Sequence, residues 1–282
     1  IFDFKTCTFF NPLMLVLIGC IAERAWIDKK EIQFIAPLNI RAKEYLQKIR
    51  LEEYWVSKFN RKNFTNVGVE SHLCLWQISV EMFDAYVTEA KQFVTRHWIN
   101  ELDVTPLFSA IKELLNNVND HSKSNEIAYT VSQHFPNISE LHIAICDFGV
   151  GIAKNVKDYI ANRTEEEFQK LRQKFEFIKD RDINEFNALR VAFELEFSTQ
   201  STPHNRGFGL DTILGYARDL KGSVHLYSNG LHIWYDSKSG ESFHSEPLPH
   251  DFNGTLLNLT INTTFMEKFY KGDYIEEVVS LG

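Results

Sequence analysis

Three short segments, in order along the chain, limit most strongly what this sequence folds into. The first, residues 113–121, reads Glu-Leu-Leu-Asn-Asn-Val-Asn-Asp-His and continues a helical apolar pattern. The second, 147–152, reads Asp-Phe-Gly-Val-Gly-Ile and ends an apolar strand; the third, 206–210, reads Arg-Gly-Phe-Gly-Leu before another apolar helix. A polar helix face, a strand that ends in glycines and a glycine-rich helix start together predict a nucleotide site.

The first segment predicts a helix with one polar side. At about 100° per residue, the apolar side carries Ile111, Leu114, Leu115 and Val118, and the polar side carries Glu113, Asn117, Asp120 and His121. A solvated helix surface is the simpler interpretation, but asparagine is a poor helix former. The amide oxygen of Asn117 suits a magnesium ion. Glu113, one turn earlier, is placed to orient or deprotonate a water that attacks a phosphate.

The second segment follows a buried strand, Leu141–Cys146, and ends at Asp147 before two glycines. A carboxylate accepts hydrogen bonds and does not donate them, so it favours adenine over guanine. Gly149 and Gly151 allow the backbone to approach a base closely. Taken alone, the segment also fits an ordinary Asp-Gly turn.

The third segment opens a helix whose apolar residues continue through Leu220. Glycines at a helix start expose backbone N–H groups to a phosphate, and Arg206 adds a charged donor for the terminal phosphates. Taken alone, the hydroxyl-rich run 198–202 just before it fits a plain loop; the family resemblance given below implies a lid there.

The order and spacing of these segments resemble the GHKL ATPases, the Bergerat-fold family of gyrase, heat-shock chaperones, histidine kinases and MutL. The resemblance implies an α/β (α+β) fold: a two-layer sandwich of a mixed sheet covered by helices, which binds ATP and Mg2+. It makes Glu113 the general base, Asn117 the magnesium ligand and Asp147 the acceptor for the adenine amine. The other nucleotide-binding positions it implies are Asp120, His121, Gly149, Gly151, Ile152, Arg206, Gly207, Phe208, Gly209, Leu210 and Thr255.

The chain divides into three predicted parts. Residues 1–69 form a small α/β domain, 70–265 the ATP-binding domain with a helical lid insertion at about 153–206, and 266–282 a C-terminal tail. Within 223–261 the pattern predicts a strand to Ser228, a hairpin turn at Asn229-Gly230, a returning strand from Leu231 and a last strand from Gly254.

The first part alternates strand and helix. Its expected elements are strand Phe2–Phe10, helix Pro12–Ala25, strand Glu31–Ala36 and helix Arg41–Phe59. The segment Thr-Phe-Phe-Asn-Pro at 8–12, followed by that helix, resembles the STAS-like domains of anti-sigma-factor antagonists. An N-terminal extension that packs on the ATP-binding domain is the alternative.

The predicted lid carries an apolar pattern within a charged run. Its helically spaced residues are Phe168, Leu171, Phe175 and Ile178. One interpretation is a helical hairpin that buttresses the lid. The other is a contact for a protein partner or for the second subunit of a homodimer.

Composition narrows the choice of partners. The formal net charge of −8, without a Lys/Arg run, argues against nucleic acid as the main ligand. The four cysteines lie among apolar residues without paired spacing, which favours a reduced, cytoplasmic protein. The apolar stretch 13–22 is too short to span a bilayer, so no membrane span is expected.

Three functions are compatible with these patterns. The first is a magnesium-dependent ATPase whose lid or dimer switches conformation to regulate a protein partner, bound through the N-terminal part or the lid. The second is a histidine or serine protein kinase of the anti-sigma type that acts on a separate protein. The third is an ATP sensor without hydrolysis, which an intact Glu113 disfavours.

Overall fold

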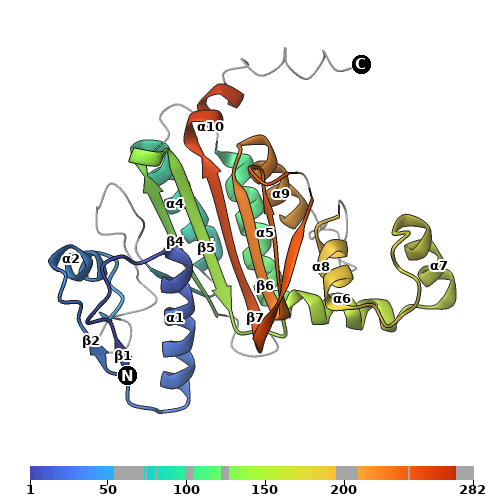
Figure 1. The fold of residues 1–282 in the computed structure, drawn as a ribbon, viewed down its shortest axis with the longest axis horizontal. Helices are drawn as coiled ribbons and strands as arrows, with labels where there is room; N and C mark the ends of the chain where they lie inside the picture. Colours follow the sequence, from blue (N-terminus) through green and yellow to red (C-terminus); the bar gives the residue numbers. More distant parts are fainter. Residues whose placement is uncertain are drawn as a thin grey trace.

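A computed structural model describes residues 1–53, 73, 75–79, 82–98, 104–121, 127–194, 209–240 and 242–270. For residues 116–121, 127 and 267–270 it describes the backbone element but not the side chains. The expected α/β character is confirmed, since helices pack in layers against a β-sheet (Figure 1).

The main sheet has five strands among the described residues, in the order β3-β4-β5-β7-β6. They are β3 (Trp76–Ser79), β4 (Ile127–Phe135), β5 (Glu140–Asp147), β7 (His244–Asn262) and β6 (Ser223–Asp236). Each neighbouring pair in this sheet is antiparallel. The expectation of a mixed sheet is therefore wrong for the described strands. Short turns join β4 to β5 and β6 to β7, and short turns produce antiparallel neighbours.

The strand β6 reverses direction within its own length. Ser237 N donates to Gly222 O at 3.0 Å, although a straight strand would separate these residues by about 50 Å. The rings of Tyr227 and His232 stack with centroids 3.9 Å apart, as cross-strand neighbours do. Asn229 has φ of +55°, a conformation that asparagine tolerates. The predicted Asn229-Gly230 hairpin is confirmed.

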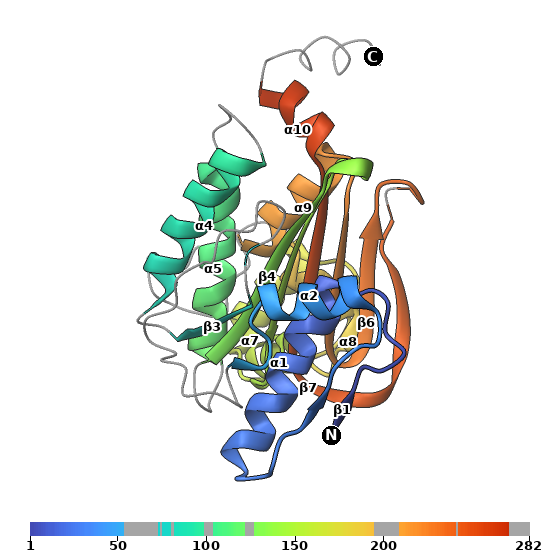
Figure 2. The same ribbon diagram turned by 90° about the vertical axis from the view of Figure 1, so that its left-hand side faces the viewer.

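Helices cover the sheet on both faces (Figure 2). One face packs against α4 (Phe83–His97), α5 (Thr105–His121) and α9 (Gly209–Asp219). The other face packs against α1 (Pro12–Ile27), where the hydroxyl of Tyr129 on β4 donates to Glu23 at 2.7 Å. The buried residues of α1 belong to the same hydrophobic core as those of the sheet.

The N-terminal part keeps the expected alternation but has shorter elements. It comprises β1 (Phe2–Asp3), α1, β2 (Phe34–Ile35) and α2 (Ile40–Lys48), with β1 and β2 parallel. The first strand is short because the chain turns directly after it. Lys5 N donates to the Asp3 side chain, and Cys7 N donates to Phe4 O. The long helix expected to Phe59 ends at Lys48, shortly before Arg50 takes a positive φ of 59°; residues 54–59 lie outside the description.

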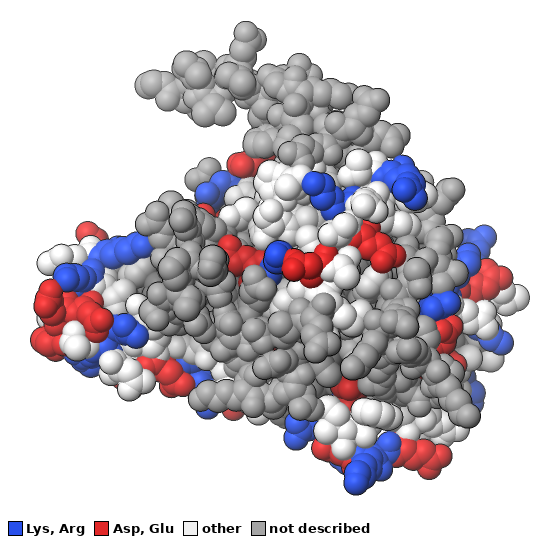
Figure 3. All heavy atoms as spheres, turned by 180° about the vertical axis from the view of Figure 1, so that it is seen from behind, with Lys and Arg blue, Asp and Glu red and all other residues white. Residues whose placement is uncertain are grey.

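The predicted lid region is helical as far as it is described. It contains α6 (Ile152–Ala161), α7 (Glu165–Lys174) and α8 (Glu185–Ala192). A capping box between Thr164 and Glu167 begins α7. Acidic and basic side chains lie together at the tip formed by α7 (Figure 3), in pairs such as Lys170–Glu166 at 2.7 Å.

The apolar residues of the lid pack inside it. Phe168, Phe175 and Ile178 are all buried, and Leu171 is partly buried. The guanidinium of Arg181 lies 4.6 Å from the centroid of the Phe168 ring. These side chains form the core of the helical unit, as the buttress interpretation expects, and are not exposed as a contact for a partner.

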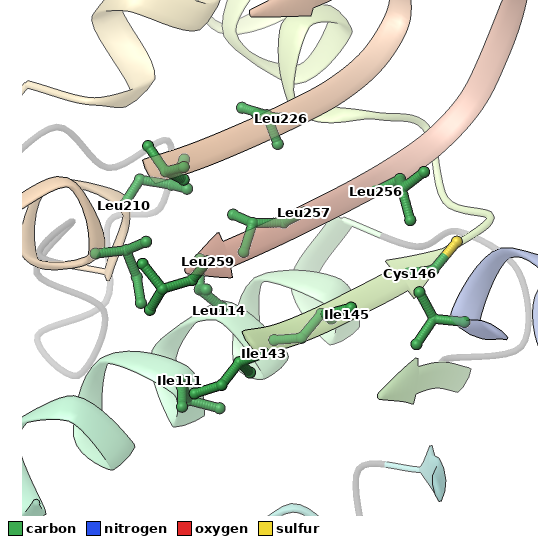
Figure 4. Close-up of a cluster of buried hydrophobic side chains, with 14 of the residues drawn as sticks. Ile111, Leu114, Ile143, Ile145, Cys146, Leu210, Leu226, Leu256, Leu257 and Leu259 are labelled. Atoms are coloured by element: carbon green, nitrogen blue, oxygen red, sulfur yellow. The ribbon is translucent and has the colours of Figure 1, made fainter. Parts of the chain in front are cut away.

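The centre of the fold is the strand β5, which is buried on both faces. Ile143 and Ile145 face Ile111 and Leu114 of α5 (Figure 4). Cys146 faces α1, where the thiol of Cys20 donates to its backbone oxygen at 3.3 Å. Burial on both faces explains why β5 reads as a nearly continuous apolar run. It also places Asp147, the last residue of β5, next to the interior of the protein.

After the sheet, α10 (Thr263–Tyr270) spans the expected domain end at 265, and residues 271–282 lie outside the description. Within the described part of the chain, no helix combines the length and hydropathy needed to cross a bilayer.

Candidate nucleotide site

The carboxylate of Asp147 is buried at the end of β5. Only 5% of the residue is exposed. Gly149 N donates to Asp147 Oδ1 at 2.6 Å, and the hydroxyl and backbone N–H of Thr255 also donate to this carboxyl. Thr255 is the Cα partner of Asp147 on the neighbouring strand β7, so strand register holds the two side chains together.

Burial raises the pKa of Asp147 to about 6, although the donors from Gly149 and Thr255 act in the opposite direction. Removal from water disfavours the charged form of a carboxyl. A buried carboxyl with a raised pKa beside a cavity is typical of a functional site.

A hollow lies beside this carboxyl, between α5, α6 and the sheet. Its cavity volume is about 40 Å³, and the space reaches about 480 Å³ when the part open to solvent is included. Its lining residues are Leu114, Ile145, Asp147, Gly149, Val150, Gly151, Ile152, Asn155, Thr255 and Leu257. Five of the expected site residues are in this set: Asp147, Gly149, Gly151, Ile152 and Thr255.

A close approach of backbone to backbone shapes this end of the sheet. Gly254 has φ of +143°, and a Cβ there would lie 2.1 Å from Asp147 O. Gly254 is therefore required for β7 to pass the end of β5. Gly151 has φ of +82°, and a Cβ there would lie 2.6 Å from Asn229 Oδ1.

The first and third sequence segments meet beside the hollow. A Cβ on Gly209, the first residue of α9, would lie 3.3 Å from Glu113 Cγ. Glu113 directly precedes Leu114, which lines the hollow. The fold thus brings the acidic residue of α5 against the start of α9. Leu210, the next residue of α9, is buried in the core.

Several expected site residues lie outside the detailed description. Arg206, Gly207 and Phe208 precede the first described residue of α9. Asn117, Asp120 and His121 lie on the last turns of α5, but their side chains are not described. Asn117 therefore stays a predicted magnesium ligand, on the helical turn that follows Glu113.

No protein-family model matches the chain, and no curated protein matches it at a significant level.

Two residues at the β6 hairpin belong to the site region and were missed in the sequence. Ser228 Oγ accepts from Ile152 N at 2.8 Å, and Asn229 Oδ1 accepts from Lys154 N at 3.0 Å. Asn229 Nδ2 also donates to Val150 O at 3.1 Å. The Asn-Gly signal predicted the turn, but not that its side chains cap the helix beside the hollow.

We expect Asn229→Ala to lower the free energy of unfolding by about 1–2 kcal/mol, as loss of a helix-capping side chain does. The variant leaves Lys154 N and Val150 O without their side-chain partner. Asn229→Asp keeps the acceptor for Lys154 N and is expected to lose less. Urea unfolding of the three proteins measures the difference; equal stability of Asn229→Ala and the unmutated protein would contradict the capping role.

The raised pKa of Asp147 predicts a pH-dependent stability. Between its ordinary pKa of 3.8 and about 6, the folded state binds more protons than the unfolded state, so stability falls as pH rises through this window. Asp147→Asn removes this contribution, on the order of 2 kcal/mol. Its free energy of unfolding, measured relative to the unmutated protein, should therefore increase from pH 4 to pH 7. A constant difference would mean that burial does not raise this pKa.

Proposed function

We propose that the hollow at the end of β5 binds the adenine of ATP and that the protein hydrolyses ATP in the presence of magnesium. The observation that carries the proposal is the buried Asp147 carboxylate, held by Gly149 and Thr255 at the edge of an open, largely apolar hollow. A flat base fits apolar walls, and its exocyclic amine needs an acceptor.

The proposed position of the phosphates rests on the contact between the start of α9 and Glu113. Gly209 opens α9 next to Glu113, and a helix start offers N–H groups to anions. In this proposal the phosphates lie beside the contact of these two elements, and Glu113 takes a proton from the attacking water. Bound magnesium would neutralise phosphate charge, with Asn117 as its proposed protein ligand.

Binding of ATP is also proposed to close the segment from about 153 to 206 over the phosphates. Its described part, 153–194, is largely helical and follows Gly151, whose φ of +82° is a conformation that glycine adopts readily. Closure that depends on the γ-phosphate would make the protein a switch acting on a protein partner.

Calorimetric titration with ATP and with GTP tests the proposed ligand. The keto group of guanine accepts hydrogen bonds where adenine has an amine, so it would face the acceptor Asp147 without a proton between them. ATP is expected to bind at least tenfold more tightly than GTP. Equal affinities would overturn the assignment of this hollow to adenine.

We expect ATP to protect the segment 153–194 from hydrogen exchange more than ADP does, because ATP alone supplies a γ-phosphate. The comparison uses Glu113→Ala, in which the expected loss of turnover keeps ATP intact. The strands β5 and β7 provide an internal control, since both nucleotides should protect their ends near Asp147 and Thr255 equally. Identical protection of 153–194 with ADP and ATP would mean that closure does not depend on the γ-phosphate.

A further inference from the structure

The start of α6 forms one wall of the hollow, and its backbone donors are already used. The first N–H groups of a helix normally lack partners and attract anions. Here the N–H groups of the first three helical residues have acceptors on β6, and the fourth makes the first intrahelical bond. The bonds are Ile152 N and Ala153 N to Ser228 Oγ (2.8 and 3.4 Å), Lys154 N to Asn229 Oδ1 (3.0 Å) and Asn155 N to Gly151 O (3.2 Å).

This pairing determines which part of a nucleotide the α6 wall meets. Because the N–H groups of Ile152, Ala153 and Lys154 are paired with β6, the first turn of α6 does not offer them to a phosphate, and α6 contributes to the ligand mainly through side chains. Ile152 and Asn155 are the α6 residues that line the hollow. The phosphates belong at the other end, where α9 begins beside Glu113. The α6 wall therefore faces the base.

The polar side chains of the hollow differ in whether they can donate or accept a further hydrogen bond. The Asp147 carboxylate accepts only, and the Thr255 hydroxyl already donates to it. Among the side chains that line the hollow in the described part of the chain, the amide of Asn155 is the further group that donates. Adenine presents ring nitrogens that accept, besides the amine that donates. A hollow with an acceptor alone would leave those nitrogens without a partner.

We propose that Asn155 is a second specificity-determining residue of this site, whose Nδ2 donates to a ring nitrogen of adenine while Asp147 accepts from the amine. The inference rests on the proposed function. Together the two side chains present an acceptor and a donor, which match the amine and an adjacent ring nitrogen of adenine. Guanine carries a keto oxygen and a protonated ring nitrogen at the corresponding positions. Its oxygen would face the acceptor of Asp147 and its N–H would face the donor of Asn155, so both contacts disfavour guanine.

The test is a calorimetric titration with magnesium and ATP, GTP or 2′-deoxy-ATP. Asn155→Leu preserves the approximate size of the side chain and removes its polar atoms. We expect this variant to bind ATP about three- to tenfold more weakly, with less loss for GTP. The loss should be the same with 2′-deoxy-ATP, because the contact is to the base. Lys154→Ala, the exposed neighbour on the same helix, is the matched control and should bind as the unmutated protein does.

The outcomes separate this inference from the proposed function. If the unmutated protein does not bind ATP, both fail. If it binds ATP, and Asp147→Ala weakens binding while Asn155→Leu does not, the inference about Asn155 alone is overturned. A loss for Asn155→Leu that disappears with 2′-deoxy-ATP would place the amide against the ribose and also overturn it. Thermal unfolding of the ligand-free variants should be unchanged, since the Asn155 side chain has no hydrogen-bond partner among the described residues.

Discussion

Replacement of Glu113 by glutamine is expected to reduce ATP turnover by about 10²–10⁴-fold, the usual contribution of a general base, while ATP still binds. Gln keeps the shape of the side chain that packs against Gly209 at the start of α9, so the two helices should stay together. The loss should appear in kcat, since Glu113 is proposed to act on the attacking water and not on the bound nucleotide.

Lys112→Ala is the matched control for Glu113→Gln. Lys112 precedes Glu113 on the same helix and pairs with Asp84 of α4 at 2.5 Å, with both side chains well exposed. Loss of an exposed pair costs about 0–1 kcal/mol of stability and should leave turnover unchanged. Normal hydrolysis by Glu113→Gln would remove Glu113 from the chemistry and leave binding as the role of the site.

The second large effect is expected at Asp147. Asp147→Ala should weaken ATP binding about ten- to hundredfold, because it removes a hydrogen bond to a charged group worth about 1.5–3 kcal/mol. Asp147→Asn retains an acceptor and should lose less. Asp147→Ala leaves the donors of Gly149 and Thr255 without their acceptor, which lowers stability, so thermal unfolding of each variant must show a folded protein at the titration temperature.

Thr255→Val tests how Asp147 is held. Valine has the shape of threonine without the hydroxyl that donates to the carboxyl. Its effect on ATP affinity should be intermediate, because Gly149 N still donates to Asp147 Oδ1. Calorimetry on the three variants gives the order. Binding of ATP by Asp147→Ala as tight as by the unmutated protein would remove Asp147 from the recognition of adenine.

Local patterns predicted the parts of this site that depend on a single element. The apolar face of α5 contains Ile111, Leu114 and Leu115, all buried as expected from helical periodicity. The end of β5 at Asp147 followed from an apolar run before glycines, and the Asn229-Gly230 hairpin followed from its dipeptide. In each case the signal lies within a few neighbouring residues.

The parts that depend on distant contacts were not predictable from one sequence. Ser228 and Asn229 cap a helix that lies about 75 positions earlier in the chain, and nothing in the local pattern pairs them. Asn155 was not among the expected site residues, and its place beside the hollow follows from how α6 joins the sheet. For α1 the sequence left two interpretations open, a separate small domain or an extension that packs on the main domain, and the shared core agrees with the second.

The strand directions show a further limit. The resemblance to the GHKL ATPases implied a mixed sheet, yet β5 pairs antiparallel with both β4 and β7. Pairing partners and directions follow from the path of the connections and the packing of helices on each face. Periodicity identifies strands but does not identify their neighbours.

The most direct test of the account is the fate of the γ-phosphate. The unmutated protein is incubated with magnesium and γ-labelled ATP, in parallel with Glu113→Gln and Asp147→Ala. The account predicts that the label is released as free phosphate by the unmutated protein, is retained on ATP bound to Glu113→Gln, and is released far more slowly by Asp147→Ala at low ATP concentration. Label that stays on ATP with the unmutated protein, or that is transferred to a protein side chain, would contradict hydrolysis as the function of this site.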